Sequence, residues 1–443
     1  MKFYKIMSIK KGFKLWRQAK KIIPGGSQLL SKRVEMFLPE QWPAFFKKAK
    51  GVEVWDLDGN KYLDVNASIG ACILGYADPE VNRAVKKAID DGSNSTLNCP
   101  EEVKLAELLC KLHPWAKMVR YARGGGEAMA VAVRIARAYS GKSQVAFCGY
   151  HGWSDWYLAA NIVNDKSLDG HLLSGLEPRG VPRELKGTAI PFRYNKIAEL
   201  KKIVSKNKNI GVIVMEPLRH EEPKDNFLKQ VRKIADKIGA VLVFDEVTIG
   251  WRLNVGGAHL KYGVNPDIAV FAKGLSNGFP MAAIIGKKEI MQAAQTTFIS
   301  SSSWTERIGP TAALATINKM IDKKVPEHLN RIGRLVVKGL KQAAKNNQLK
   351  VTVAGPPPLI HFSFDYGADS QAIRTLFTQE MLKKKILASG GVYVTYSLKK
   401  KQAKRYLRAV EETFRLLRKA IDNNQVHSLL NGPIAHSGFK RLV

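Results

Sequence analysis

The stretch AVLVFDEVTIGWRLNVGGAHLKYGVNPDIAVFAKG, residues 240–274, holds two short apolar runs, and a charged side chain follows each of them. Asp245 follows the run Ala240–Phe244, and Lys273 follows the run Ile268–Phe271 after one alanine. Apolar runs of this length between helical patterns indicate buried, mostly parallel strands. Ligands of open α/β sheets bind beyond the carboxyl ends of the strands, so we expect this carboxylate and this amine beside a ligand.

The same alternation of apolar runs and helical patterns continues on both sides of this stretch. Further apolar runs lie at Gln144–Cys148, Ile210–Met215 and Ala282–Ile285, and helical patterns at 127–140, 196–207 and 225–238. Past about residue 330 the pattern changes to helices, an alternating segment at Leu359–Phe364 and a long helix from Lys400 to Ile421. We therefore expect an α/β fold with a large domain over 65–325 and a small domain built from 1–64 and 326–443.

The bulk composition is that of a globular protein, neither disordered nor fibrous. The chain has 443 residues, of which 45% are apolar, enough for a large core and two or three domains. The cysteines Cys72, Cys99, Cys110 and Cys148 show no CxxC spacing, and no histidine pair has zinc-ligand spacing. We expect reduced thiols, a cytoplasmic location and no metal. We also expect neither a signal peptide nor a membrane span.

The net charge of +33 is unevenly distributed. Residues 1–50 hold 13 basic and 2 acidic side chains, and residues 331–443 hold 21 basic and 6 acidic ones. Such an excess raises the question of a nucleic-acid or anionic-surface partner. The basic residues are scattered over many predicted helices, so we do not expect nucleic acid as a partner. We therefore prefer a generally basic proteome or an anionic metabolite as substrate as the explanation of the charge.

Two further features stand where such a sheet would present a ligand. Gly124-Gly125-Gly126 precedes a helical pattern, and a helix N-terminus with close backbone approach suits a phosphate. Tyr150 follows the run Gln144–Cys148 and could stack on a planar ring. Each feature alone has an ordinary explanation, such as a flexible turn or a rim aromatic.

Taken together, the four features match the needs of one cofactor. Asp245 alone could be a metal ligand, a base or the partner of a protonated ring nitrogen, and Lys273 alone could be a surface lysine. Burial would lower the pKa of such a lysine and leave an amine able to form an imine. A phosphate cradle, a ring contact, a carboxylate and an amine are the groups that pyridoxal phosphate requires.

The chain resembles the class III aminotransferase family, most closely the branch that includes glutamate-1-semialdehyde 2,1-aminomutase. The strings that carry the resemblance are VWDLDGNKYLDV at 54–65, LGYADPEV at 74–81, GGGEA at 124–128, VIVMEP at 212–217, VLVFDEVTIGWR at 241–252, PDIAVFAKGLSNGFPMAA at 266–283 and TERIGP at 305–310. The FDEV and AKGLSNGFP strings are the most specific. The similarity runs from about Leu15 to the helix near residue 420.

The resemblance implies the pyridoxal-phosphate transferase fold type I, with a mostly parallel seven-stranded sheet and a smaller α+β domain. It implies pyridoxal 5'-phosphate as the cofactor and a homodimer with shared active sites. Lys273 would be the Schiff-base lysine and proton shuttle, and Asp245 would bind the pyridine nitrogen. Val247 and Tyr150 would press on the two faces of the ring.

The resemblance assigns the remaining contacts to the cofactor's edge. Gly125 and Gly126 would hold the phosphate through backbone N–H groups, and Glu216 would lie on the ring-hydroxyl side. Thr305 would reach the phosphate of the neighbouring subunit. The chain departs from the family's Ser-Gly-Thr at 124–126, which removes two hydroxyl contacts. Arg123 stands beside that loop and could either compensate as a phosphate cation or lie on the surface.

We therefore expect a pyridoxal-phosphate-dependent aminotransferase. It would move an amino group between an amine or amino-acid donor and a carbonyl acceptor in ping-pong fashion, through a Lys273 Schiff base. The nearest alternative is an intramolecular amine shift of the aminomutase type. Against it, SIGAC at 68–72 lacks the tryptophan of that branch, and SGGVYVTY at 389–396 lacks its gating carboxylate.

An alternative of another class is a basic nucleic-acid or anionic-surface binding protein on a retired enzyme scaffold. The intact pair of Lys273 and Asp245 argues against it. The tail GFKRL at 438–442 is similar to that of aminotransferases of surface-polysaccharide pathways and suggests that setting.

Overall fold

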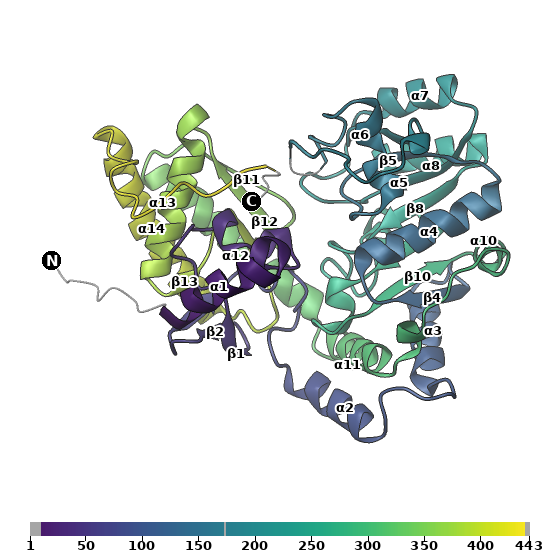
Figure 1. The fold of residues 1–443 in the computed structure, drawn as a ribbon, viewed down its shortest axis with the longest axis horizontal. Coiled ribbons are helices and arrows are strands. Elements are labelled where there is room, and N and C mark those ends of the chain that lie inside the picture. The colour runs from purple at the N-terminus through teal and green to yellow at the C-terminus, as the bar shows by residue number, and fades with distance from the viewer. Residues whose placement is uncertain (1–9, 172–173, 439–443) are drawn as a thin grey trace. The chain divides into compact units, whose positions relative to one another are not determined.

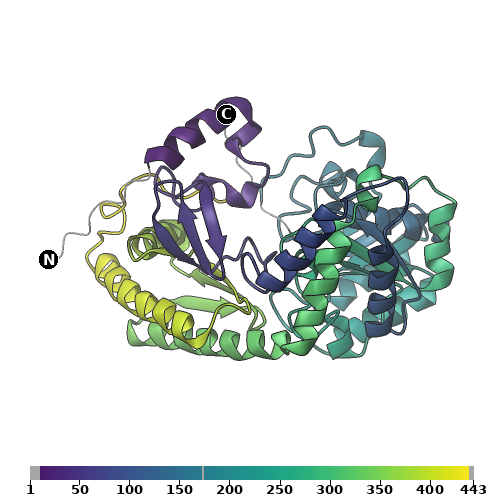
Figure 2. The same cartoon turned by 90° about the horizontal axis from the view of Figure 1, so that it is seen from below.

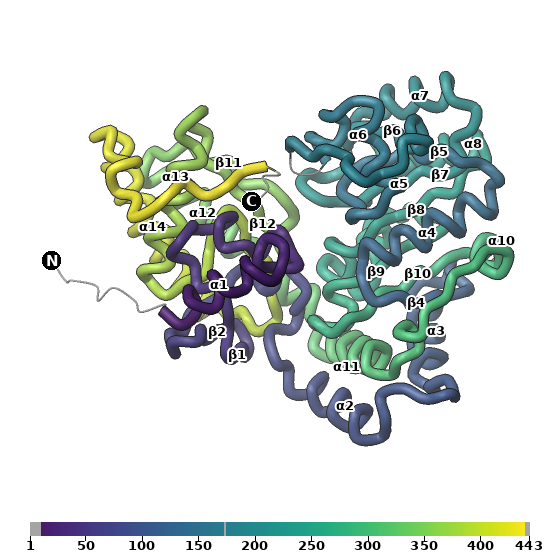
Figure 3. Tube along the Cα trace, in the orientation of Figure 1, coloured from purple at the N-terminus to yellow at the C-terminus, as the bar shows by residue number. Residues whose placement is uncertain are grey.

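The structure is a computed structural model that describes residues 10–171 and 174–438. The chain forms two compact units (Figures 1 and 3). One is built from the described residues of Met1–Asp78 and His328–Val443, the other from Pro79–Glu327. The domain limits expected at residues 64 and 325 remain a prediction.

A seven-stranded sheet forms the centre of the unit Pro79–Glu327. Its strands are, in spatial order, β4 (Met118–Ala122), β10 (Ala282–Gly286), β9 (Ile268–Phe271), β8 (Val241–Asp245), β7 (Ile210–Met215), β5 (Gln144–Cys148) and β6 (Ala189–Pro191). Neighbours from β9 to β6 pair in parallel, and β10 runs antiparallel to both β9 and β4. The expected α/β class with a mostly parallel seven-stranded sheet is confirmed, and all five apolar runs are strands of it.

Helices cover both faces of this sheet because alternate strand residues are apolar on both sides. Val241 and Val243 of β8 belong to the core under α4 (Gly125–Ser140). Leu242 and Phe244 belong to the core under α7 (Ile197–Lys206) and α8 (Phe227–Ile238). The remaining helices of this unit are α2 (Pro79–Asp90), α3 (Pro100–Leu112), α5 (Asp155–Leu158), α6 (Ala160–Val163), α9 (His259–Tyr262), α10 (Lys288–Met291) and α11 (Ile308–Asp322). Figure 1 shows α4 lying along the sheet.

The other unit combines two small sheets with long helices. Its sheets are β1 (Phe46–Lys50), β2 (Glu53–Asp56), β3 (Lys61–Asp64) and β13 (Ile386–Leu387), and β11 (Val351–Ala354), β12 (Leu359–Phe364) and β14 (Gly391–Tyr393). Its helices are α1 (Lys10–Ile22), α13 (Ser370–Lys383), α14 (Lys400–Asp422) and all but the first turn of α12 (Val325–Asn346). Figure 2 shows α12 and α14 running as long rods in this unit.

Two properties of residues 10–171 and 174–438 bear on the expected partners. No helix there combines the length and the apolar character needed to cross a membrane. In the same residues, no group of three or more histidine, cysteine, aspartate or glutamate side chains could hold a metal ion.

Candidate active site

Asp245 is the last residue of β8, and its side chain is buried and held from two directions. Its Oδ1 accepts a hydrogen bond from the Val247 N–H at 3.0 Å. Its Oδ2 lies 2.8 Å from Nδ1 of His151, a fully buried ring whose Nε2 lies 3.2 Å from the Cys148 carbonyl oxygen. Both partners of the ring are acceptors, and the carboxylate is the nearer and the charged one, so the imidazole donates from Nδ1 to the carboxylate. The carboxylate is therefore fixed in orientation.

Lys273 follows β9, the neighbour of β8, so the amine and the carboxylate leave the same edge of the sheet. Its Nζ donates to Thr248 Oγ1 at 2.9 Å. Although part of the side chain is accessible, burial lowers the Lys273 pKa to about 8, and Arg252 acts in the same direction. Glu216 and Asp245 oppose this shift, which places both carboxylates within electrostatic reach of the amine.

The backbone of Lys273 is itself unusual. Its φ of 45° lies in the left-handed region, which a side chain with a Cβ disfavours. Residues held in such conformations cluster at functional sites, because the surrounding structure must compensate for the strain. The observation supports a functional role for Lys273 independently of its pKa.

The glycine triplet forms the start of α4, and it leaves an open cradle. The N–H groups of Arg123 and Gly124 donate to the Glu127 carboxylate at 2.9 and 3.2 Å. The N–H groups of Gly125 and Gly126 have no hydrogen-bond partner among the described residues. A Cβ on Gly125 would lie 2.9 Å from Val247 Cγ1, so glycine is required where the helix start approaches the strand end.

Tyr150 and Glu216 are linked on another side of the site. The Tyr150 N–H donates to Glu216 Oε2 at 3.2 Å, and Glu216 is buried. Arg219 donates to the same oxygen at 3.1 Å, and its guanidinium lies 5.9 Å from the centre of the Tyr150 ring. Burial, followed by the charge of Asp245, raises the pKa of Tyr150. The tyrosine thus stays neutral beside a cation.

Among the residues that the structure describes, Thr305 makes no hydrogen bond to the other predicted site residues. Its hydroxyl donates to the Ser302 carbonyl oxygen at 2.9 Å, within a short helical turn. Arg123 connects this turn to the glycine loop. It donates to the carbonyl oxygens of Trp304 and Glu306 at 2.8 and 3.0 Å and forms an ion pair with the Glu306 carboxylate at 2.8 Å. Arg123 is neither a free phosphate cation nor a surface side chain.

Three residues with contacts to this site carried no role in the sequence-based prediction: His151, Thr248 and Arg219. Thr248 lies inside the string VLVFDEVTIGWR at 241–252, His151 follows Tyr150 directly, and Arg219 stands two residues after the string VIVMEP at 212–217. Position after a strand end was the available signal. The local backbone decides which of these side chains turns toward the site, and this direction cannot be predicted from the sequence pattern.

A family model described as "Aminotransferase class-III" matches residues 38–398. The chain belongs to this family. Among its relatives, the 3-aminobutyryl-CoA aminotransferase of Cloacimonas acidaminovorans is 31% identical over 85% of this chain and 89% of that protein. The glutamate-1-semialdehyde 2,1-aminomutase of Acetivibrio thermocellus is 35% identical over 76% of this chain and 80% of that protein. The resemblance of the sequence motifs to the class III aminotransferase family is thus confirmed.

Solved structures confirm the fold. The FumI protein of Sphingopyxis sp. MTA144, solved in a PLP form, superposes with a TM-score of 0.84 at 23% identity over 95% of this chain and 99% of that one. An omega-transaminase from Sphaerobacter thermophilus gives 0.82 at 22% identity over 92% of this chain and 98% of that one. The aminotransferase therefore has fold type I.

Enzymes of this family depend on pyridoxal 5'-phosphate, and the residues present fit that group. The fit rests on three observations: two N–H groups without a partner at a helix start, a buried and oriented carboxylate, and an amine of lowered pKa on the next strand. The chain is thus a pyridoxal-phosphate-dependent aminotransferase of class III.

Proposed function

We propose that the enzyme transfers an amino group from an anionic amine donor to a carbonyl acceptor, with Lys273 as the residue that holds the cofactor and moves the proton. The observation that carries the proposal is the amine of Lys273, whose pKa lies near 8, at the strand next to Asp245. A proton-transferring group works best when its pKa lies near the operating pH.

The bound cofactor would supply an electron sink for the carbon that carries the substrate's amino group. Lys273 Nζ would hold the cofactor and, once displaced by a donor amine, take the proton from that carbon. The Thr248 hydroxyl, 2.9 Å from Nζ, would orient the amine. Arg252 donates from Nε to the Thr248 carbonyl oxygen at 2.7 Å and so anchors this threonine.

Asp245 would bind the protonated ring nitrogen, and His151 would keep the carboxylate in place. Val247 and Tyr150 would contact the two ring faces, with Glu216 near the ring hydroxyl. Gly125 and Gly126 would bind the phosphate through their N–H groups, at the positive end of the α4 dipole. Since both are glycines, this part of the cradle offers backbone donors alone.

The position of Arg219 is the reason for proposing an anionic group on the substrate. Its guanidinium is partly exposed, lies beside the Tyr150 ring and is close enough to Lys273 to lower the pKa of that amine. A cation in this position would attract a carboxylate or phosphate of the donor or acceptor. Donors with a carboxylate should therefore be used with a lower KM than the matching amines without one.

A homodimer with shared sites is part of the proposal, with Thr305 acting on the phosphate of the partner subunit. Its test is a mixed dimer of a Lys273→Ala subunit and a Thr305→Ala subunit. If Thr305 acts across the interface, both lesions fall in one site, and about half of the activity remains. If it acts within its own subunit, activity at limiting cofactor falls well below half, and the assignment is wrong.

The decisive experiment has two parts. Borohydride treatment of the holoenzyme followed by peptide mapping should place the cofactor on Lys273. A screen of amine donors, monitored by the absorbance change of the cofactor, should then find donors that convert it, and carbonyl acceptors that restore it. The screen should include β-amino acids and CoA thioesters, because one relative is named for 3-aminobutyryl-CoA. An adduct on another residue would refute the central assignment.

The aminomutase alternative is tested in the same screen. Several relatives are named glutamate-1-semialdehyde 2,1-aminomutase, so an intramolecular shift has direct support from sequence. A mutase converts its substrate with no separate acceptor, whereas a transaminase stops after one half-reaction. A role in surface-polysaccharide synthesis rests on the tail at 438–442, nearly all of which lies outside the described residues.

A further inference from the structure

The helix α12 carries all of its charged side chains, Glu327 and five cations, on a single face. Its five lysines and arginines are Arg331, Arg334, Lys338, Lys341 and Lys345, and all are exposed. Their spacing of three, four, three and four residues places them in one stripe along the helix. The opposite face, which includes Val336 and Leu340, is buried. From Arg334 to Lys345 the stripe extends for about 16 Å at 1.5 Å per residue.

In the described residues, the cations of this stripe have no carboxylate partner. Other cations of the same unit do have them, as in the pairs Lys384–Glu412 and Arg418–Asp422. Within the part of the chain that the structure describes, no carboxylate lies within 4.0 Å of the nitrogens of Arg334, Lys338, Lys341 or Lys345. Four neighbouring positive charges repel one another, so binding an anion there would lower the electrostatic energy of the protein.

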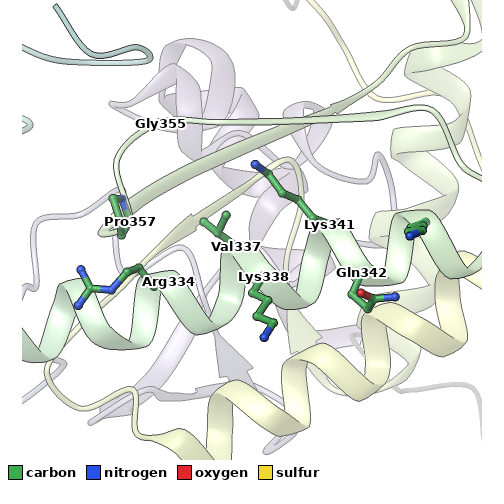
Figure 4. Close-up of a pocket in the computed structure, with 8 residues that line it drawn as sticks. Arg334, Val337, Lys338, Lys341, Gln342, Gly355 and Pro357 are labelled. Carbon is green, nitrogen blue, oxygen red and sulfur yellow. The ribbon is translucent and has the colours of Figure 1, made fainter.

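The stripe also borders a shallow, open groove. The groove has a volume of about 480 Å³, and its lining comprises Arg334, Val337, Lys338, Lys341, Gln342, Lys345, Gly355 and Pro357. Figure 4 shows Val337 and Lys341 projecting from the helix on the side of the Gly355–Pro357 turn, and Lys338 and Gln342 on its other flank. The turn packs so closely on the helix that a Cβ on Gly333 would overlap the Pro357 carbonyl.

We propose that this groove binds a metabolite of nucleotide size that carries two or more phosphate groups. The volume lies within the range of single small-molecule sites, about 300–1,000 Å³. The lysines and the arginine would bind the phosphates, and Val337 and Pro357 would contact the uncharged part. The lining holds no aromatic side chain on which nucleic-acid bases could stack, which disfavours a single-stranded nucleic acid.

The test measures ADP binding to the holoenzyme by calorimetry, with adenosine and inorganic tripolyphosphate as companion probes. We expect ADP and tripolyphosphate to bind with an affinity that falls as salt increases, and adenosine not to bind. The double variant Lys338→Gln/Lys341→Gln should weaken ADP binding by roughly tenfold or more. The control Lys401→Gln/Lys404→Gln removes the same charge from exposed positions of α14 and should change the affinity less than twofold.

Three outcomes would overturn the proposal: no ADP binding, an equal loss in both variants, or a greater loss for a 20-nucleotide single-stranded DNA than for ADP. The last result would indicate that the stripe binds a nucleic-acid strand and not a small metabolite. If the double variant fails to fold, ADP protection of Lys338 and Lys341 from acetylation, mapped by mass spectrometry on the unmodified sequence, decides the same question. Absence of protection then refutes the site.

Discussion

Two consecutive carboxylates at the end of β8, Asp245 and Glu246, each pair with a buried histidine through Nδ1 at 2.8 Å. Asp245 is the last residue of β8, and the N–H of Glu246 still donates to the Val270 carbonyl oxygen of β9 at 2.9 Å. The alternation of the strand therefore continues through Glu246 and sends the two side chains to opposite faces of the sheet. Glu246 accepts from the N–H groups of Ala258 and His259 and from the His259 ring. Asp245 accepts from one N–H group and from His151.

The difference lies in what the second nitrogen of each ring contacts. His259 Nε2 accepts from the Trp115 indole at 3.0 Å while Nδ1 faces Glu246, so both ring nitrogens have complementary partners and the network is closed. His151 Nε2 faces a carbonyl oxygen, so its ring has only acceptors around it. Of the two carboxylates, Asp245 is the one that affects the pKa of Lys273. Two similar carboxylate–histidine pairs can thus have different roles, one in the candidate active site and one in stabilising the fold.

The largest expected effect is that of Asp245→Asn on turnover. An amide cannot hold the proton on the ring nitrogen of the cofactor, so we expect kcat to fall by roughly 10²–10³-fold, the usual cost of removing one electrostatic partner. The fold and part of the cofactor binding should remain. Steady-state kinetics with saturating cofactor, together with circular dichroism, provides the measurement. A rate near that of the wild type would remove Asp245 from this role.

Glu246→Gln should show the opposite pattern, a loss of stability with little loss of chemistry. The buried carboxylate accepts three hydrogen bonds, and an amide leaves at least one donor of that network without an acceptor. We expect the free energy of unfolding to fall by about 2–3 kcal/mol. Urea unfolding of the apoprotein measures this. If kcat per folded molecule fell as far as in Asp245→Asn, the separation into site and scaffold would be wrong.

The substitutions His151→Ala and His259→Ala compare the two rings directly. Loss of the His151 hydrogen bond frees the Asp245 side chain, and we expect kcat to fall roughly tenfold, about 1.4 kcal/mol in activation free energy. His259→Ala should instead lower the unfolding midpoint and leave kcat within about twofold. Equal kinetic effects of the two substitutions would contradict the assignment. His151→Asn, whose side-chain amide can still donate to the Asp245 carboxylate, provides a partial-rescue control.

The smallest expected effect concerns the pH at which apoenzyme captures its cofactor. Because the Lys273 pKa is lowered to about 8, half of the amine is neutral near pH 8, and the attachment rate should rise with pH, pass through an inflection near pH 8 and level off above it. Asp245 raises this pKa, so Asp245→Asn should move the inflection to lower pH. Stopped-flow absorbance measures the rate. Glu246→Gln serves as the control and should leave the inflection in place.

The sequence predicted the parts of this arrangement that depend on the order of residues along the chain. Apolar runs marked the strands, and Asp245 and Lys273 were assigned to their ends because a strand end is visible as a change of polarity. The partners were not predicted, since they depend on side-chain directions. Nothing in the spacing indicates that His151 reaches Asp245, or that Arg123 bonds the carbonyl groups near Thr305.

The adjacency of Asp245 and Glu246 also limits how this strand can change by insertion or deletion. A shift of β8 by one residue would exchange the two faces of the strand and send the glutamate toward Lys273 and the aspartate into the network of His259. The aspartate side chain is one methylene shorter and would have to replace an acceptor of three hydrogen bonds. A slipped strand would therefore lose both the site and its support. The acidic pair therefore fixes the register of β8. We expect insertions and deletions in functional relatives to fall in the loops outside residues 241–246.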